Sequence, residues 1–127
     1  MLIVDDTAIV RVVVRRTLEA DGRFEIVGEA ANGRIAIEQA LTCAPDLVLL
    51  DLAMPEMDGL EALPHLRVAT PEAKVIVLSA FTPDQMAAQA MKAGACAYLE
   101  KSSLARELVP NILAALDADA ALLDAQA

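Results

Sequence analysis

Residues typical of nucleic-acid-binding or membrane proteins are scarce in this sequence. Lys and Arg number 10 against 19 Asp and Glu, which gives a net charge of −9. Nucleic acids and anionic membranes are bound by cationic surfaces, so direct binding of either is not expected. No apolar run approaches the roughly 18 residues of a membrane-spanning helix. The run at residues 1–4 stops at Asp5, which is too soon for a signal peptide.

Cysteine and histidine are also rare. Cys43 and Cys96 are far apart and lack metal-site spacing, so we interpret them as reduced core thiols of a cytoplasmic protein. His65, the only histidine, follows Pro64 in a predicted helix, and a solvated surface position is a better interpretation than a phosphorelay histidine. The chain of 127 residues is long enough for one domain with a proper core.

Short apolar runs alternate with segments of helical spacing. The runs predict strands at residues 1–4, 24–28, 47–51, 74–78 and 96–100. Between and after them, apolar residues recur every three or four positions, which predicts helices, two of which end at Gly22 and Gly94. Because an interior proline costs about 3 kcal/mol, we expect the helix around Pro64 to begin late or to bend there. A last helix, capped by Ser102 or Ser103, is expected to contain Pro110.

The strict alternation of strands and helices predicts an α/β fold. We expect a single doubly wound parallel sheet with helices on both faces. The run at residues 47–50 is apolar at every position, as in a strand that is buried on both faces of such a sheet. Residues 1–116 would form this domain, and residues 117–127 would be a helix extension, a linker or a disordered tail.

Polar residues stand at the carboxyl ends of the predicted strands. Asp5 and Asp6 follow the first strand, Asp51 ends the third, Ser79 follows the fourth and Lys101 follows the fifth. In a parallel sheet these ends lie along one edge, where open α/β sheets place their ligand sites. We therefore expect these side chains to converge.

Three convergent carboxylates indicate a cation. Their mutual repulsion would raise each pKa unless a cation shared the site, and a hard divalent ion with oxygen ligands, Mg²⁺ above all, meets this need. A lysine and a hydroxyl beside it suit a phosphoryl group. An aspartate can also be the nucleophile that forms an acyl phosphate.

Over roughly residues 1–116 the chain resembles the receiver domains of two-component response regulators. The motifs that carry the resemblance are residues 2–6 (LIVDD), 51–59 (DLAMPEMDG), 79–80 (SA), 94–95 (GA) and 98–101 (YLEK). Each motif is weak alone, but together, in this order and at strand ends, they are specific. The resemblance implies a CheY-like or flavodoxin-like sheet of five strands in the order 2-1-3-4-5, with five helices.

The resemblance also implies a role for each residue of the site. Asp51 would accept a phosphoryl group from a phosphohistidine of a sensor histidine kinase or phosphotransfer protein. Asp5, Asp6, Asp51 and the backbone carbonyl of Ala53 would hold Mg²⁺. Lys101 would pair with the phosphoryl oxygens.

Two further residues would carry the switch. Ser79 would hydrogen-bond the phosphoryl group, and Tyr98 would move inward behind it and remodel the face of the fourth helix and fifth strand. The domain would thus be a signalling switch for an output domain or partner, with possible homodimerisation, rather than a turnover enzyme. Plainer interpretations are a strand-end serine, a core tyrosine, and a helix-capping role for Asp5 or Asp6.

Some features point to a subclass, and others depart from the family. Residues 24–33 (FEIVGEAANG) resemble regulators of the NarL type, whose output is a C-terminal helix-turn-helix. No such output lies within these 127 residues, so we expect either an excised receiver or a single-domain regulator. The family usually has proline after the lysine, whereas Ser102 follows Lys101. We expect a cis peptide there to aim Lys101, although it would cost roughly 2.5–4 kcal/mol. Phe81, two residues after Ser79, is expected to shield the phosphoryl group from water.

Two other classes of function fit part of the pattern. A haloacid-dehalogenase-like Mg²⁺ phosphatase also uses an aspartyl nucleophile, but it needs a second aspartate two residues later, where this chain has Ala53. A degenerate receiver would bind a partner without phosphorylation, although the full acidic set counts against it. Treatment with acetyl phosphate or beryllofluoride and Mg²⁺ distinguishes the three.

Overall fold

The computed structural model describes residues 1–54, 57–80, 83–103 and 107–117. The strands and helices alternate along the chain as follows: β1 (Leu2–Val4), α1 (Ala8–Asp21), β2 (Gly28–Ala30), α2 (Gly33–Cys43), β3 (Leu47–Leu50), α3 (Gly59–Ala69), β4 (Lys74–Ser79), α4 (Pro83–Ala93), β5 (Ala97–Glu100) and the 3₁₀ turn η1 (Lys101–Ser103). Residues 107–117 form a further helix.

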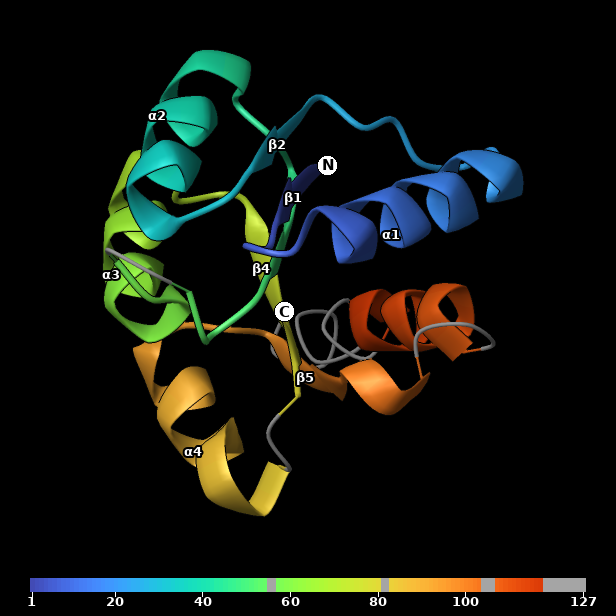
Figure 1. The fold of residues 1–127 in the computed structure, drawn as a ribbon. Coiled ribbons are helices and arrows are strands. Elements are labelled where there is room, and N and C mark those ends of the chain that lie inside the picture. The colour runs from blue at the N-terminus through green and yellow to red at the C-terminus, as the bar shows by residue number, and fades with distance from the viewer. Residues whose placement is uncertain (55–56, 81–82, 104–106, 118–127) are drawn as a thin grey trace.

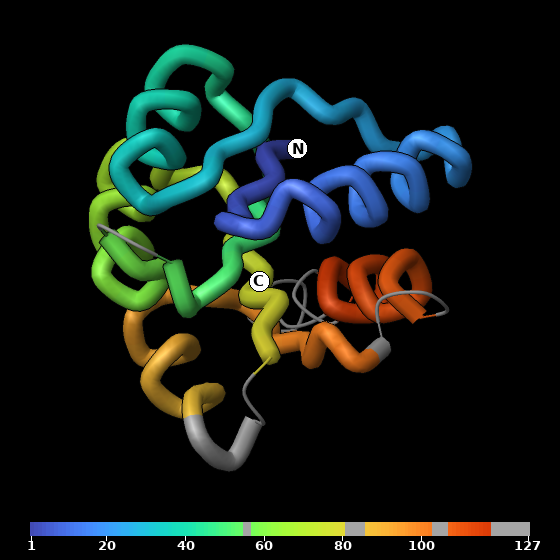
Figure 2. Tube along the Cα trace, in the orientation of Figure 1, coloured from blue at the N-terminus to red at the C-terminus, as the bar shows by residue number. Residues whose placement is uncertain are grey.

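The strands form one parallel sheet in the order β2-β1-β3-β4-β5. Figure 1 shows α1 and the helix of residues 107–117 on one face and α2, α3 and α4 on the other. The tube in Figure 2 follows the chain as it crosses between the two helical layers. The predicted doubly wound α/β fold and strand order are confirmed.

Two hydrophobic clusters lie on opposite faces of the sheet. Val4, Leu50 and Val77 belong to the cluster under α2, α3 and α4. Their strand neighbours Ile3 and Leu49 belong to the cluster under α1 and the last helix. Because side chains alternate along a strand, each of these strands is buried on both faces. This explains why their sequences are apolar at every position.

The second strand was predicted in the wrong place. The prediction of residues 24–28 followed Phe24 and Ile26, which are half-buried against the α1 cluster but lie outside the strand. The backbone instead joins the sheet later: Val27 N–H donates to the Met1 carbonyl at 2.9 Å, and Gly28–Ala30 pair with β1. The apolar residues Phe24 and Ile26 therefore indicate packing against the cluster under α1 and the last helix, not pairing with a strand.

The ends of the helices follow largely from local chemistry. Gly22 and Gly94 have φ of 85° and 118° at the ends of α1 and α4, as predicted, because glycine adopts this conformation without a Cβ clash. Of the two outcomes predicted for the helix around Pro64, the late start is wrong: α3 begins at Gly59, where the Asp58 side chain accepts from Glu61 N–H at 2.8 Å, and Pro64 lies inside the helix. The bend at Pro64 stays a prediction. The start of the last helix lies outside the described residues.

The remaining predictions about single residues have simple outcomes. His65 is exposed on α3. Cys43 and Cys96 are free thiols and half-buried rather than fully within the core. In the described part of the chain, no helix is both long and apolar enough to cross a bilayer.

Candidate functional site at the carboxyl edge of the sheet

The two central strands bring Asp5 and Asp51 side by side. Val4 of β1 pairs with Leu50 of β3, so the next residue of each strand is an aspartate at the same level. Asp51 N–H donates to the Val4 carbonyl at 2.9 Å, which extends the pairing by one residue. Asp5 and Asp51 are only 2% and 3% exposed, whereas their neighbour Asp6 is exposed.

These three aspartates form a compact cluster with Lys101. Carboxylate oxygens of Asp5, Asp6 and Asp51 lie within 4.8 Å of one another. Lys101 Nζ is 2.7 Å from Asp5 Oδ2 and 3.2 Å from Asp51 Oδ1. The structure therefore gathers four of the predicted site residues in one place.

The pKa of Asp51 is raised by its burial and by the neighbouring carboxylates. Burial, followed by the charge of Asp5, raises it from the usual 3.8 to about 6, while Lys101 acts in the opposite direction. For Lys101, burial lowers the pKa, but the hydrogen bond to Asp5 and the charge of Asp51 outweigh it, and the pKa is raised. An ionised Asp51 beside a charged lysine is the expected state at neutral pH.

The cluster suits a hard divalent cation. Three carboxylates supply the oxygen ligands that Mg²⁺ and Ca²⁺ prefer, and one lysine cannot neutralise all three. A hollow of about 480 Å³, whose lining includes Asp6, Ala53 and Met86, gives access to the edge of the cluster. The donor set therefore fits the predicted metal.

A tightly packed loop after β3 supports Asp51. Gly59 N–H donates to the Leu52 carbonyl at 2.8 Å, and a Cβ on Gly59 would lie 2.8 Å from Leu52 Cα. The loop is also fastened to α2, because Gly33 N–H donates to the Met57 carbonyl at 3.0 Å. Sequence reasoning missed these supports, although the Asp58-Gly59 pair in the motif was a signal for the first.

The proposed switch residues lie on the neighbouring strands. Ser79 is fully buried at the end of β4 and pairs in register with Glu100, the residue before Lys101. Tyr98, on β5, is half-buried against the cluster under α2, α3 and α4. Phe81 lies outside the described residues.

The Lys101–Ser102 peptide bond is trans, so the prediction of a cis bond is wrong. Lys101 reaches both Asp5 and Asp51 without it. The intrinsic cost of a cis bond before a residue other than proline, roughly 2.5–4 kcal/mol, therefore decides the geometry.

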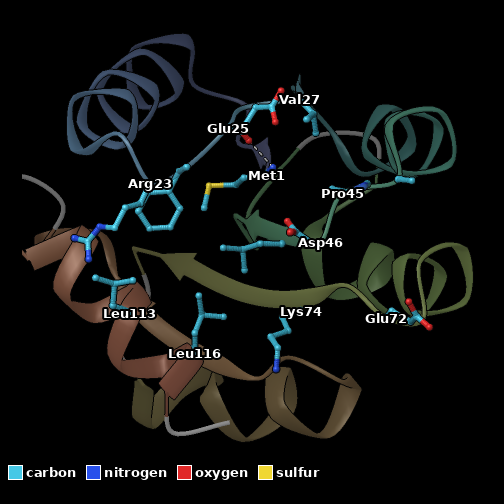
Figure 3. A pocket seen from close by; sticks show the side chains of 13 residues that line it. Met1, Arg23, Glu25, Val27, Pro45, Asp46, Glu72, Lys74, Leu113 and Leu116 are labelled. Atoms are coloured by element: carbon cyan, nitrogen blue, oxygen red, sulfur yellow. Dashed lines mark hydrogen bonds between the residues drawn. The ribbon is translucent and has the colours of Figure 1, made fainter. Parts of the chain in front are cut away.

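A larger pocket, of about 790 Å³, lies at the opposite edge of the sheet (Figure 3). Its lining includes Met1 and Lys74, at the amino ends of β1 and β4, and Leu113 and Leu116 of the last helix. It contains none of the aspartates of the cluster. The carboxyl edge is therefore the stronger candidate site.

Comparison with known proteins identifies the family of this chain. The sequence profile of the response regulator receiver domain matches residues 1–113, and the chain belongs to this family. Receiver domains are the phosphorylatable switch modules of two-component systems, so the resemblance drawn from the motifs is confirmed.

Individual relatives show how far the similarity extends. Response regulator UvrY of Escherichia coli is 39% identical over 112 residues, which are 88% of this chain and 51% of UvrY. A LuxR-family response regulator from Aurantimonas is 35% identical with a TM-score of 0.84, over 92% of this chain and 84% of that chain. A Burkholderia pseudomallei response regulator, solved with a phosphorylated aspartic acid, a calcium ion and citrate, is 30% identical with a TM-score of 0.80, over 98% of this chain and 70% of that chain. The chain spans about half the length of UvrY.

Proposed function

We propose that Asp51 is the phosphoacceptor of a signalling switch. The observation that carries the proposal is the position of its carboxylate: almost fully buried at the end of a central strand, 3.2 Å from Lys101 Nζ and grouped with two further aspartates. The phosphorylated aspartic acid in the Burkholderia relative supports the same chemistry.

The transfer needs an ionised Asp51. One carboxylate oxygen attacks the phosphorus of a phosphohistidine on a sensor histidine kinase or phosphotransfer protein. The new O–P bond forms as the N–P bond breaks, and the imidazole leaves with the electron pair of that bond and takes up a proton. With a pKa of about 6, Asp51 is mostly ionised at neutral pH. Lys101 would balance charge on the phosphoryl oxygens.

Asp5, Asp6, Asp51 and the carbonyl of Ala53 would hold Mg²⁺. When bound, the ion would neutralise charge on the carboxylates and on the incoming phosphoryl group. The grouping of the three carboxylates and the calcium ion in the Burkholderia relative support this assignment.

The response would pass through Ser79 and Tyr98. Ser79 would hydrogen-bond the phosphoryl group, and Tyr98 would move inward. This movement would change the surface of α4 and β5 that an output domain, a partner or a second copy of the chain would contact. We propose a cytoplasmic switch that does not itself bind DNA and is not a turnover enzyme. The net charge of −9 supports the absence of direct DNA binding.

Intact-mass spectrometry after incubation with acetyl phosphate and Mg²⁺ tests the proposal. One phosphoryl adduct is expected, and it should be lost in Asp51→Asn and in EDTA but retained in Asp117→Asn, which alters an exposed carboxylate of the last helix. Continuous release of phosphate without an adduct would favour a phosphatase. The absence of both an adduct and phosphate release in the wild type would favour a degenerate receiver.

A further inference from the structure

Arg11 connects α1 to the backbone between the two metal-site aspartates of the β1–α1 loop. Its Nη1 donates to the Asp5 carbonyl at 2.6 Å, and its Nε pairs with Glu29 Oε1 of β2 at 3.2 Å. The side chain is only 20% exposed. One guanidinium therefore joins a helix, a strand and the Asp5–Asp6 peptide.

Every polar group of Asp5 has a partner. Its N–H donates to the Ala30 carbonyl at 3.0 Å, its Oδ1 accepts from Thr7 N–H at 2.9 Å, and its Oδ2 contacts Lys101. Arg11 occupies the remaining group, the carbonyl. That carbonyl belongs to the peptide plane that leads into Asp6.

Asp6 has much weaker support of its own. It is exposed, and within the described part of the chain its carboxylate has one polar contact, from Thr7 Oγ1 at 3.4 Å. The direction of its side chain therefore depends on the orientation of the Asp5–Asp6 peptide. Among these contacts, the hydrogen bond from Arg11 is the one that fixes this plane at its carbonyl end.

We infer that Arg11 is a positioning residue for the metal site: it holds the Asp5–Asp6 peptide so that the Asp6 carboxylate faces Asp5 and Asp51 before a cation binds. This inference rests on the proposed Mg²⁺ site. Among the proposed metal ligands that the structure describes, Arg11 contacts only the backbone carbonyl of Asp5, so it acts by holding the Asp5–Asp6 peptide rather than by contacting the cation.

The role requires the separate N–H donors of an arginine guanidinium. Glu29 anchors the guanidinium from one side while a separate N–H reaches the carbonyl, and a lysine ammonium has no such rigid pair of donors. Arg15 provides a matched control, because its Nε pairs with the other oxygen of Glu29 at 2.8 Å without contacting Asp5. Loss of Arg15 weakens the same ion-pair network and leaves the peptide held.

Calorimetric titration with Mg²⁺ alone tests the role in Arg11→Met, Arg11→Lys and Arg15→Met. Partners that orient metal ligands typically account for 10- to 100-fold in metal affinity, so we expect Arg11→Met to bind Mg²⁺ at least roughly tenfold more weakly than the wild type. Arg11→Lys should recover only part of this loss, and Arg15→Met should remain within about twofold of the wild type. Thermal unfolding in EDTA verifies that each variant is folded.

An increase in Mg²⁺ affinity in Arg11→Met, instead of the expected decrease, would have a different meaning. If Arg11 acted mainly as a positive charge near the cation, its removal would tighten Mg²⁺ binding, because like charges repel. Tighter or unchanged binding in a folded Arg11→Met variant would overturn the positioning role, as would an equal loss in Arg15→Met. If Arg11→Met fails to fold, the same comparison between Arg11→Lys and Arg15→Met decides the question.

A metal-free measurement completes the test. In the wild type without Mg²⁺, the Asp6 amide should have the ¹⁵N order parameter of a rigid backbone, about 0.85. It should fall clearly in Arg11→Met and not in Arg15→Met, and an unchanged value would contradict the inference. If wild-type protein binds no Mg²⁺, the proposed function and this inference both fail. If wild type and Arg11→Met bind it equally, only the inference fails.

Discussion

Neutralising Asp51 should make the metal-free domain more stable at neutral pH. The raised pKa, from 3.8 to about 6, means that the ionised carboxylate is less well accommodated in the folded state than the protonated one. Each tenfold change in proton affinity is about 1.4 kcal/mol, so full ionisation costs the folded state roughly 3 kcal/mol. Solvent screening removes little of this, because Asp51 is 3% exposed.

The sign of the pH dependence follows from the same shift. Between pH 4 and 6 the folded domain binds more protons at Asp51 than the unfolded chain does, so the stability due to this group falls as pH rises through about 6. Asp51→Asn is close in shape to the protonated form and does not titrate. We therefore expect it to exceed the wild type by about 2–3 kcal/mol at pH 7.5 and by only about 0.5 kcal/mol at pH 4.

Urea unfolding followed by far-ultraviolet circular dichroism in EDTA measures this difference. Asp117→Asn, at an exposed position, should stay within about 0.5 kcal/mol of the wild type at both pH values. Adding Mg²⁺ should narrow the gap, because an ion that binds only the folded wild type stabilises it. A wild type at least as stable as Asp51→Asn at pH 7.5, or a difference independent of pH, would refute the reasoning.

Three other substitutions test the support of the site and the core. Gly59→Ala should cost about 1–3 kcal/mol or more, because its Cβ would collide with the backbone of Asp51 and the next residue. Urea unfolding should show a larger loss than for Gly22→Ala, whose Cβ would meet nothing within 4 Å and which adds only the strain of its φ of 85°. Lys101→Met leaves the buried carboxylates of Asp5 and Asp51 without their cationic partner, so its free energy of unfolding at pH 7.5 in EDTA should fall by roughly 3 kcal/mol. Mg²⁺ should restore part of this stability. An unchanged stability would contradict the role of Lys101 as the cation that balances these carboxylates. Leu18→Ala, at a fully buried position of the α1 cluster, should cost about 3–5 kcal/mol in the same unfolding assay, and a loss below about 1 kcal/mol would contradict its place in the core.

Sequence predicted the central sheet well because burial on both faces leaves a strong pattern. β1, β3 and β4 lie within one residue of their predicted positions. β2 was misplaced, since Phe24 contacts a helix-side cluster without joining the sheet. A pattern of apolar residues records burial but does not distinguish strand pairing from packing beside it.

The candidate site was predictable to a similar extent. The strand ends were enough to bring Asp5, Asp51 and Lys101 together, because parallel topology fixes which ends share an edge. The trans peptide after Lys101 and the bond from Arg11 to the Asp5 carbonyl were not predictable in this way. Both depend on how far a long side chain must reach across the folded structure, which spacing along the chain does not encode.

The strands β3 and β5 differ in burial, and this difference bears on which of them could shift if a charged group were added to Asp51. All four residues of β3 are buried, whereas all four of β5 are only half-buried. Displacing Asp51 would disturb the packing of β3 on both faces of the sheet. The strand β5, which carries Tyr98, is less tightly packed. If Asp51 is the acceptor proposed above, a structural change that begins there is expected to appear at the edge strand β5 rather than in β3. The backbone amides of β5 should exchange hydrogen faster than those of β3 even before phosphorylation.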